Sequence, residues 1–91
     1  MKITLEFTAQ LRELAGVSRL EAQVPNACCV RVGLESALKS GSEELRTAIL
    51  PAGQLAAALI LAVDDSQVDL DDPAPLRDGA QLLVLSPIAG G

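Results

Sequence analysis

The C-terminal end of the chain carries a group that could do chemistry. The 91 residues finish in Pro87-Ile88-Ala89-Gly90-Gly91. Gly90 and Gly91 have no side chains, so this end can enter a narrow channel and adopt backbone angles closed to other residues. Pro87 stiffens the start of the segment, and from there the extended chain spans at most about 17 Å. A free carboxyl on Gly91 could therefore cross a catalytic cleft on another protein. Small residues are also common at frayed chain ends, and composition alone favours that plainer interpretation.

Most other reactive arrangements are excluded by what the sequence lacks. It contains no histidine, which rules out Ser-His-Asp and Cys-His catalysis and the common histidine-rich metal sites. None of its isolated glycines precedes a Lys-Ser or Lys-Thr pair, so no phosphate-binding loop is present. An EF-hand calcium loop starting at Asp65 would need Gly and Glu where the sequence has Leu70 and Leu76. The acidic residues around Asp65 are expected to form a solvated hairpin, and we expect no bound metal or cofactor.

The two cysteines, Cys28 and Cys29, are adjacent in the sequence. Neighbouring cysteines close a disulfide only with strain, so the pair does not indicate a secreted fold held by disulfides. A thiol near the start of a helix can have a lowered pKa and take part in redox or sulfur-relay chemistry, and Arg31 is close in sequence. No Cys-x-x-Cys spacing supports such a relay, and the pattern favours a structural role.

The charge balance indicates which partners the chain can bind. The formal net charge is −5, which argues against nucleic acid and anionic membranes and favours a basic surface on a partner protein. The first residues alternate polar and apolar, unlike a signal peptide. The longest apolar stretch, Leu55 to Val63, is shorter than the roughly 20 residues of a transmembrane helix. We therefore expect a cytoplasmic protein.

The apolar pattern predicts a sheet of four to five strands. Period-two alternation marks the first two as half-buried, and their short connection suggests an antiparallel hairpin. The unbroken apolar run of the third marks a central strand buried on both faces. The predicted strands cover residues 2–8, 19–24, 59–63, 67–70 and 81–85.

Helical spacing predicts one main helix, over residues 29–40, with Gly33 as a weak point inside it. A short helical segment over 9–15 would end at Gly16, and a second short helix would begin at Ser42. One main helix across a mixed sheet is a two-layer α+β arrangement. If the first and last strands pair in parallel, both are central and the C-terminus leaves the middle of the sheet. We expect one domain over residues 1–86 and a flexible tail over 87–91.

Three segments, in order and at matching spacing, resemble one known family. Residues 7–16 read Phe-Thr-Ala-Gln-Leu-Arg-Glu-Leu-Ala-Gly, residues 76–80 read Leu-Arg-Asp-Gly-Ala, and residues 86–91 read Ser-Pro-Ile-Ala-Gly-Gly. Together they resemble the small, sulfur-carrying subunit of molybdopterin synthase. That subunit belongs to the ubiquitin-like β-grasp sulfur carriers, which include the thiamin-pathway carrier. The chain departs from the family pattern at Ala80, where Asp is usual, and at Ser86, where Pro is common.

The resemblance implies a β-grasp fold and a specific chemistry for Gly91. In that family a ubiquitin-activating-like adenylyltransferase uses ATP to adenylate the terminal carboxyl, and a sulfur donor protein then replaces AMP to leave a thiocarboxylate. The segment Pro87 to Gly91 enters the active site of the molybdopterin synthase large subunit, in a heterotetramer. There it gives its sulfur to a pterin precursor in molybdenum cofactor biosynthesis. The resemblance thus implies a chain that is not catalytic on its own and binds no cofactor.

Several alternatives share this end of the chain. Carriers for thiamin, cysteine or tRNA thiolation would use the same thiocarboxylate, whereas a ubiquitin-like modifier would join Gly91 to lysine amines. A plain β-grasp interaction module would leave the tail inert. The Leu-Arg-Glu-Leu-Ala-Gly segment favours the synthase subunit. For the partner interface we expect Phe7 and Arg12 to act with the tail.

Overall fold

The computed structural model describes residues 1–85, with the backbone alone at Ala9. The strands are β1 (Lys2–Phe7), β2 (Arg19–Gln23), β3 (Ile60–Val63), β4 (Ser66–Val68) and β5 (Gln81–Leu85). The helices are α1 (Ala9–Ala15), α2 (Val30–Leu38), α3 (Glu43–Ile49) and the short 3₁₀ helix η1 (Pro51–Gly53). The predicted order of elements is confirmed, with ends that shift by one or two residues. None of the helices in residues 1–85 has the length and apolar character needed to cross a membrane.

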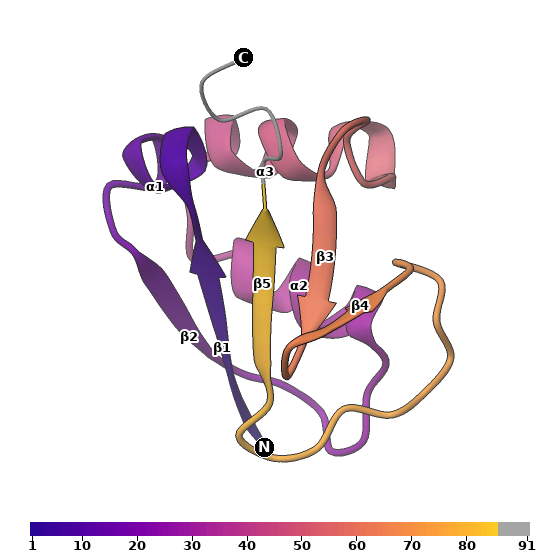
Figure 1. The fold of residues 1–91 in the computed structure, drawn as a ribbon. Helices are drawn as coiled ribbons and strands as arrows, with labels where there is room; N and C mark the ends of the chain where they lie inside the picture. Colours follow the sequence, from indigo (N-terminus) through magenta and orange to yellow (C-terminus); the bar gives the residue numbers. More distant parts are fainter. Residues whose placement is uncertain (86–91) are drawn as a thin grey trace.

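The strands form one mixed sheet in the order β2-β1-β5-β3-β4. β5 pairs in parallel with β1, and the other neighbouring pairs are antiparallel. The condition stated from the sequence is therefore met, and the last strand occupies the centre of the sheet beside the first. Figure 1 shows β1 and β5 side by side and pointing toward the same end of the molecule. The expected α+β arrangement, a mixed sheet crossed by one main helix, is confirmed.

One face of the sheet forms the hydrophobic core with the helices. Alternation along β1 points Ile3 and Leu5 inward, where neither has any exposed surface. α2 crosses behind the sheet (Figure 1) and buries the predicted stripe of Val30, Leu34, Ala37 and Leu38. A Cβ on Gly33 would lie 2.8 Å from Cδ1 of Leu76 and 3.1 Å from Cδ1 of Ile3. The glycine that weakens the isolated helix therefore lets α2 pack closely on these two side chains, whose ends would have to shift to admit a Cβ.

Side chains at the ends of α2 and α3 satisfy exposed backbone groups. The Ser42 hydroxyl accepts a hydrogen bond from the Leu45 backbone N–H at 3.1 Å, which confirms the predicted start of α3. Arg46 donates to the Leu38 and Gly41 carbonyl oxygens, at 3.2 and 2.7 Å. The guanidinium thus gives a donor to carbonyl oxygens that have no partner within α2, and its charge complements the negative end of the α2 dipole. The two helices are thus joined by hydrogen bonds as well as by packing.

The prediction that the third strand is buried on both faces is confirmed only in part. Ala62, on the face opposite Leu61, is buried at 8% exposed. β3 does lie inside the sheet, between β5 and β4, and Leu61 points into the core. No helix covers the opposite face of β3 and β5 in Figure 1. Ile60 is therefore only half-buried there. The apolar run at this strand reflects a core contact on one side and an uncovered apolar surface on the other.

The turn between β3 and β4 is formed by Asp64 and Asp65, whose φ angles are 48° and 72°. Two positive φ angles in a two-residue connection are typical of a type I′ turn, which favours Asn-Gly. The Asp64 carboxylate accepts hydrogen bonds from Nε and Nη2 of Arg77, at 3.1 and 3.2 Å, and from the Gln81 backbone N–H at 3.0 Å. Asp64 therefore ties the turn to the start of β5. Asp65 accepts no hydrogen bond within the described part of the chain.

We expect Asp65→Gly to raise the free energy of unfolding by about 0.5–1 kcal/mol, because glycine adopts a positive φ without steric cost. Asp64→Gly also places a glycine at a positive φ, but it removes three hydrogen bonds. We therefore expect it to lower the free energy of unfolding by about 1 kcal/mol. Urea unfolding of both variants and of the wild type measures the difference. Equal stabilisation by the two substitutions would show that Asp64 does not hold the turn to β5.

Candidate functional site: the central strand and its open face

The predicted reactive end of the chain is attached to the centre of the sheet. Leu85 is the last residue of β5 and the last one that the structure describes. The predicted site residues Pro87, Ile88, Ala89, Gly90 and Gly91, and the predicted boundary after residue 86, lie outside the described residues. The structure gives their point of attachment, at the end of the sheet toward which β1 and β5 both run (Figure 1).

Beside this attachment point, four apolar side chains lie on the face of the sheet that no helix covers. This group, which we call the open-face patch, consists of Ile60 and Ala62 on β3 and Leu83 and Leu85 on β5. Ile60 pairs with Leu85 and Ala62 with Leu83 across the two strands, so all four project to the same face. Ala62 is 8% exposed and the other three are half-buried. None of the four belongs to the hydrophobic core cluster.

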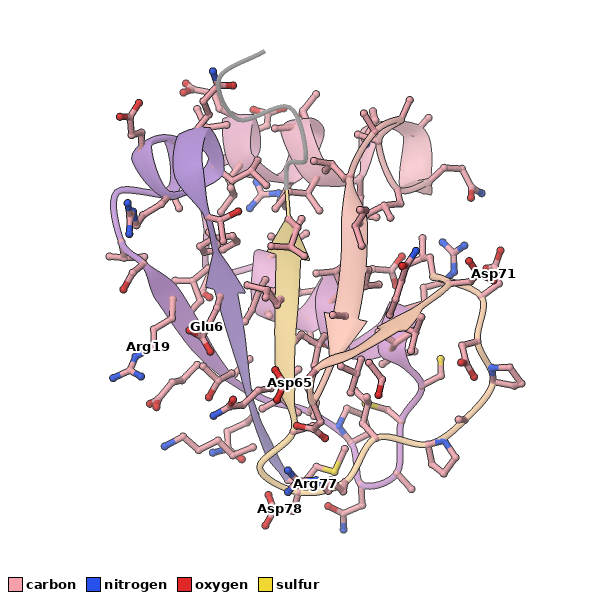
Figure 2. All side chains as sticks on the ribbon, in the orientation of Figure 1. Glu6, Arg19, Asp65, Asp71, Arg77 and Asp78 are labelled. Atoms are coloured by element: carbon pink, nitrogen blue, oxygen red, sulfur yellow. The ribbon has the colours of Figure 1, made fainter. Side chains whose placement is uncertain are left out.

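Charged side chains border the open-face patch on β1 and β2. Glu6 is the register partner of Leu83 on one side and of Arg19 on the other, and Figure 2 shows Glu6 and Arg19 in front of these two strands. Farther along the same pair of strands, Lys2 Nζ lies 3.2 Å from a carboxylate oxygen of Glu21. An apolar centre beside a polar rim is the usual anatomy of a protein–protein interface. This face can therefore dock another protein.

The two residues expected at the partner interface differ in their surroundings. Phe7 is 4% exposed and lies in the core, because the alternation along β1 points it inward with Ile3 and Leu5. The expected contact of Phe7 with a partner is therefore corrected, since a ring in this position has almost no surface to offer. Arg12 is exposed on α1, and its role at an interface stays a prediction.

The open-face patch was not named as a site from the sequence, although the apolar run from Leu59 to Val63 fits a sheet face that a partner protein covers. The signal that could have found it is Leu83 and Leu85, which continue the apolar run of β5 at positions that alternation assigns to the outer face. A strand covered on only one face does not need apolar residues at those positions.

Cys28 and Cys29 are half-buried free thiols immediately before α2. Cys28 packs against the core, and its carbonyl oxygen accepts a hydrogen bond from the Leu76 backbone N–H at 2.8 Å. Burial raises the pKa of the Cys28 thiol, and the neighbouring Cys29 raises it further. A nucleophilic cysteine needs a lowered pKa, so the structure favours a structural role for Cys28.

Three acidic residues of the described part of the chain, Glu21, Asp64 and Asp71, form ion pairs. Among residues 1–85, no group of three or more His, Cys, Asp or Glu side chains could hold a metal ion. Asp71 accepts a hydrogen bond from Nη2 of Arg31 at 2.6 Å, and this bond raises the pKa of the arginine. Nη1 of Arg31 donates to the Gly53 carbonyl oxygen at 2.6 Å. Arg31 thus ties η1 and the loop after β4 to the first turn of α2.

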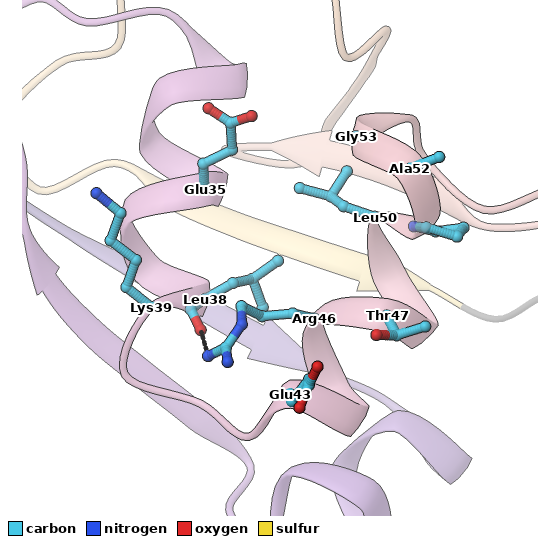
Figure 3. A pocket seen from close by; sticks show the side chains of 10 residues that line it. Glu35, Leu38, Lys39, Glu43, Arg46, Thr47, Leu50, Ala52 and Gly53 are labelled. Atoms are coloured by element: carbon cyan, nitrogen blue, oxygen red, sulfur yellow. Dashed lines mark hydrogen bonds between the residues drawn. The ribbon is translucent and has the colours of Figure 1, made fainter.

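A cleft of about 500 Å³ lies on the helical side of the molecule, between α2 and α3. Figure 3 shows Glu35 and Lys39 on its α2 side and Arg46 turned toward the Leu38 carbonyl. Its lining contains neither cysteine nor histidine, and it mixes acidic and basic side chains. We see no arrangement in it that points to catalysis.

The raised pKa of Cys28 predicts a pH dependence of stability. The contribution is fully present below the pKa of this thiol in the unfolded chain and is lost as pH rises through the higher folded-state pKa. The ordinary value is 9.0, so we expect the free energy of unfolding to fall between about pH 8 and pH 10 more steeply in the wild type than in Cys28→Ala. Denaturant unfolding across this pH range measures both slopes. Parallel slopes would contradict the burial of the Cys28 thiol.

The chain is similar to several proteins of known structure in its fold. No protein-family model matches the chain, and no curated protein matches its sequence. Small archaeal modifier protein 1 from Haloferax volcanii has a TM-score of 0.84 and 17% identity over 100% of both chains. A protein named as a candidate molybdopterin converting factor subunit 1, from Pyrococcus furiosus, has a TM-score of 0.73 and 26% identity over 97% of this chain and 99% of that one. The BexX/CysO complex from Amycolatopsis orientalis matches with a TM-score of 0.72 and 20% identity over 98% of this chain and 99% of that one.

These neighbours are ubiquitin-like β-grasp proteins, so the predicted fold class is confirmed. Their names cover a protein modifier and a converting factor subunit, and they do not separate the molybdopterin pathway from its alternatives. The chain therefore has the ubiquitin-like β-grasp fold that these small modifier and sulfur-carrier proteins share.

Proposed function

We propose that the chain is a sulfur carrier whose working group is the carboxyl of Gly91 at its C-terminus. The observation that carries this proposal is the parallel pairing of β1 and β5. It attaches the segment Pro87 to Gly91 to the central strand, next to the open-face patch. A partner that docks on the open-face patch would receive the terminal residues at its own active site.

The chemistry of a carboxylate explains why such a carrier needs an activating enzyme. A carboxylate is a poor acyl donor because its oxygen is a poor leaving group. Attack of a Gly91 carboxylate oxygen on the α-phosphorus of ATP would release pyrophosphate and give an acyl adenylate. The outer sulfur of a donor protein's persulfide would then attack the acyl carbon, and AMP would leave to give an acyl disulfide. A thiol would cleave its sulfur–sulfur bond, which releases the thiocarboxylate and leaves a disulfide between the thiol and donor sulfurs. No charged or polar side chain is buried among the described residues, which supports a chain whose catalytic groups come from its partners.

Within this class, we favour the small subunit of molybdopterin synthase. Residues 7–16 resemble that subunit's N-terminal motif, and the Pyrococcus furiosus protein with a converting-factor name has 26% identity over nearly the whole chain. The partners would be an adenylating enzyme and the large synthase subunit, where the thiocarboxylate would give its sulfur to a pterin precursor.

Protein modification is the second candidate, and the fold shared with small archaeal modifier protein 1 favours it. The same acyl adenylate would then be attacked, directly or through a thioester, by a lysine amine of a target protein. The product would be an isopeptide bond to Gly91 instead of a thiocarboxylate.

Intact mass measures the outcome of the proposed reaction. After incubation with a cognate activating enzyme, ATP and a sulfur donor, we expect the chain ending at Gly91 to gain the mass difference between one sulfur and one oxygen. Deletion of Gly91 should abolish the change, because the last carbonyl would no longer reach the reacting centre. Adducts with lysine-containing proteins and no sulfur gain would favour the modifier, and no change with any activating enzyme would defeat both candidates.

The open-face patch should set how well the activating enzyme binds the carrier. We expect Leu83→Ser to raise the KM for the carrier about tenfold with little change in kcat, because it removes apolar contact and leaves the reacting end intact. Val32→Ser is the matched control, since Val32 is 36% exposed on α2 and lies away from the open face. Equal KM values for the two variants would show that the enzyme docks elsewhere.

A further inference from the structure

A second apolar hollow lies between α1 and α3. Figure 1 shows both helices at the end of the sheet toward which β1 and β5 run. The hollow, which we call the α1–α3 groove, has a volume of about 550 Å³ and is lined by Leu14, Glu43, Glu44, Thr47 and Ala48. Leu14 is 40% exposed and is one of the three large apolar side chains that are exposed among the described residues. An apolar hollow with an exposed leucine on its wall is typical of a binding surface.

The charged residues that line the α1–α3 groove are all acidic. Glu43 and Glu44 are both exposed and form its acidic rim, and none of its lining residues is basic. Arg46 is the basic residue of α3, but its guanidinium donates to the Leu38 and Gly41 carbonyls, on the side of α3 that faces α2. Arg46 therefore does not neutralise the rim. An apolar floor under an acidic rim selects a ligand that is apolar at its centre and basic at its edges.

We propose that the α1–α3 groove binds a segment of a partner protein that presents one apolar side chain flanked by lysine or arginine. The apolar side chain packs on Leu14 and Ala48, and the flanking cations lie beside Glu43 and Glu44. This binding does not use Gly91, so it goes beyond the carrier function and holds whether or not the carboxyl is activated. It gives the chain a second docking surface, separate from the open-face patch.

The cleft between α2 and α3 does not support a comparable proposal. Its lining combines Glu35 and Glu43 with Lys39 and Arg46, so its charge selects no particular ligand. The α1–α3 groove differs from this cleft because its charged lining residues, Glu43 and Glu44, are all acidic.

The test uses a short synthetic peptide with a central leucine between lysines, titrated into the isotope-labelled full chain and followed by amide chemical shifts. We expect the shifts to centre on Leu14, Thr47 and Ala48. Leu14→Ser should weaken the peptide's Kd about tenfold. Val17→Ser is the matched control, because Val17 is 44% exposed but does not line the groove, and it should leave the Kd unchanged.

A second pair of variants separates the rim from the overall acidity of the chain. Neutralising the rim with Glu43→Gln and Glu44→Gln together should weaken binding about fivefold and reduce its salt dependence. Glu6→Gln with Glu13→Gln makes the same change in net charge outside the groove, so it should have little effect.

Four results would overturn the proposal. They are equal weakening by the two double variants, equal weakening by Leu14→Ser and Val17→Ser, shifts centred on the open-face patch, and equal binding of a peptide whose lysines are replaced by glutamates. Shifts at the groove that depend on chain concentration without peptide would assign it to a second copy of the chain instead.

Discussion

The parallel pairing of β1 and β5 is the interaction on which the rest of this structure depends. β5 stands between two antiparallel pairs, β1 with β2 and β3 with β4, and it is the strand that hydrogen-bonds to both pairs in the sheet. The ladder begins where the Gly79 backbone N–H donates to the Lys2 carbonyl oxygen at 2.7 Å and the Lys2 N–H donates to Oδ1 of Asp78 at 2.9 Å. Gly79 has a φ of 82°, which glycine adopts freely. The turn before β5 thus aligns the last strand on the first.

The same pairing determines what each face of the sheet can do. The inner face buries aliphatic side chains against the helices, and the buried residues in the described part of the chain include no polar or charged one. This core is built with a single aromatic residue, Phe7, so its stability depends on close aliphatic contact such as that of α2 at Gly33. The outer face has no helix to cover it, and its apolar residues gather on the two strands nearest the attachment of the terminal segment.

Much of the fold could be predicted from the sequence because local signals agree with the tertiary structure. Alternation along β1, the apolar stripe of α2, the glycine that ends α1 and the serine that begins α3 all act within a few residues. From the sequence, the parallel pairing of β1 and β5 could be stated only as a condition, since no local sequence signal determines which strands pair. The predicted burial of both faces of β3 holds for Leu61 and Ala62 but not for Ile60. An apolar run does not say how completely each face of a strand is covered.

The site was predicted less completely than the fold. The family resemblance, and not composition alone, predicted Pro87 to Gly91 as the reactive end, and the surfaces that would present it depend on contacts between distant segments. Phe7 has the residue type expected of an interface, yet its register on β1 places it in the core. The α1–α3 groove has no sequence signature at all, because it arises where two short helices meet at one end of the sheet.

The length of the terminal segment limits where a partner can dock. Since the segment from Pro87 spans at most about 17 Å, a partner must bind close to the end of β5 if the carboxyl is to reach its active site. The open-face patch includes Leu85, the residue at that end. Under the proposed function, docking there would make the reaction of the carboxyl effectively intramolecular, so binding energy from the sheet would position the reacting group. Residues 1–85 bury no polar or charged side chain, and under the same proposal the partners would supply the catalytic groups.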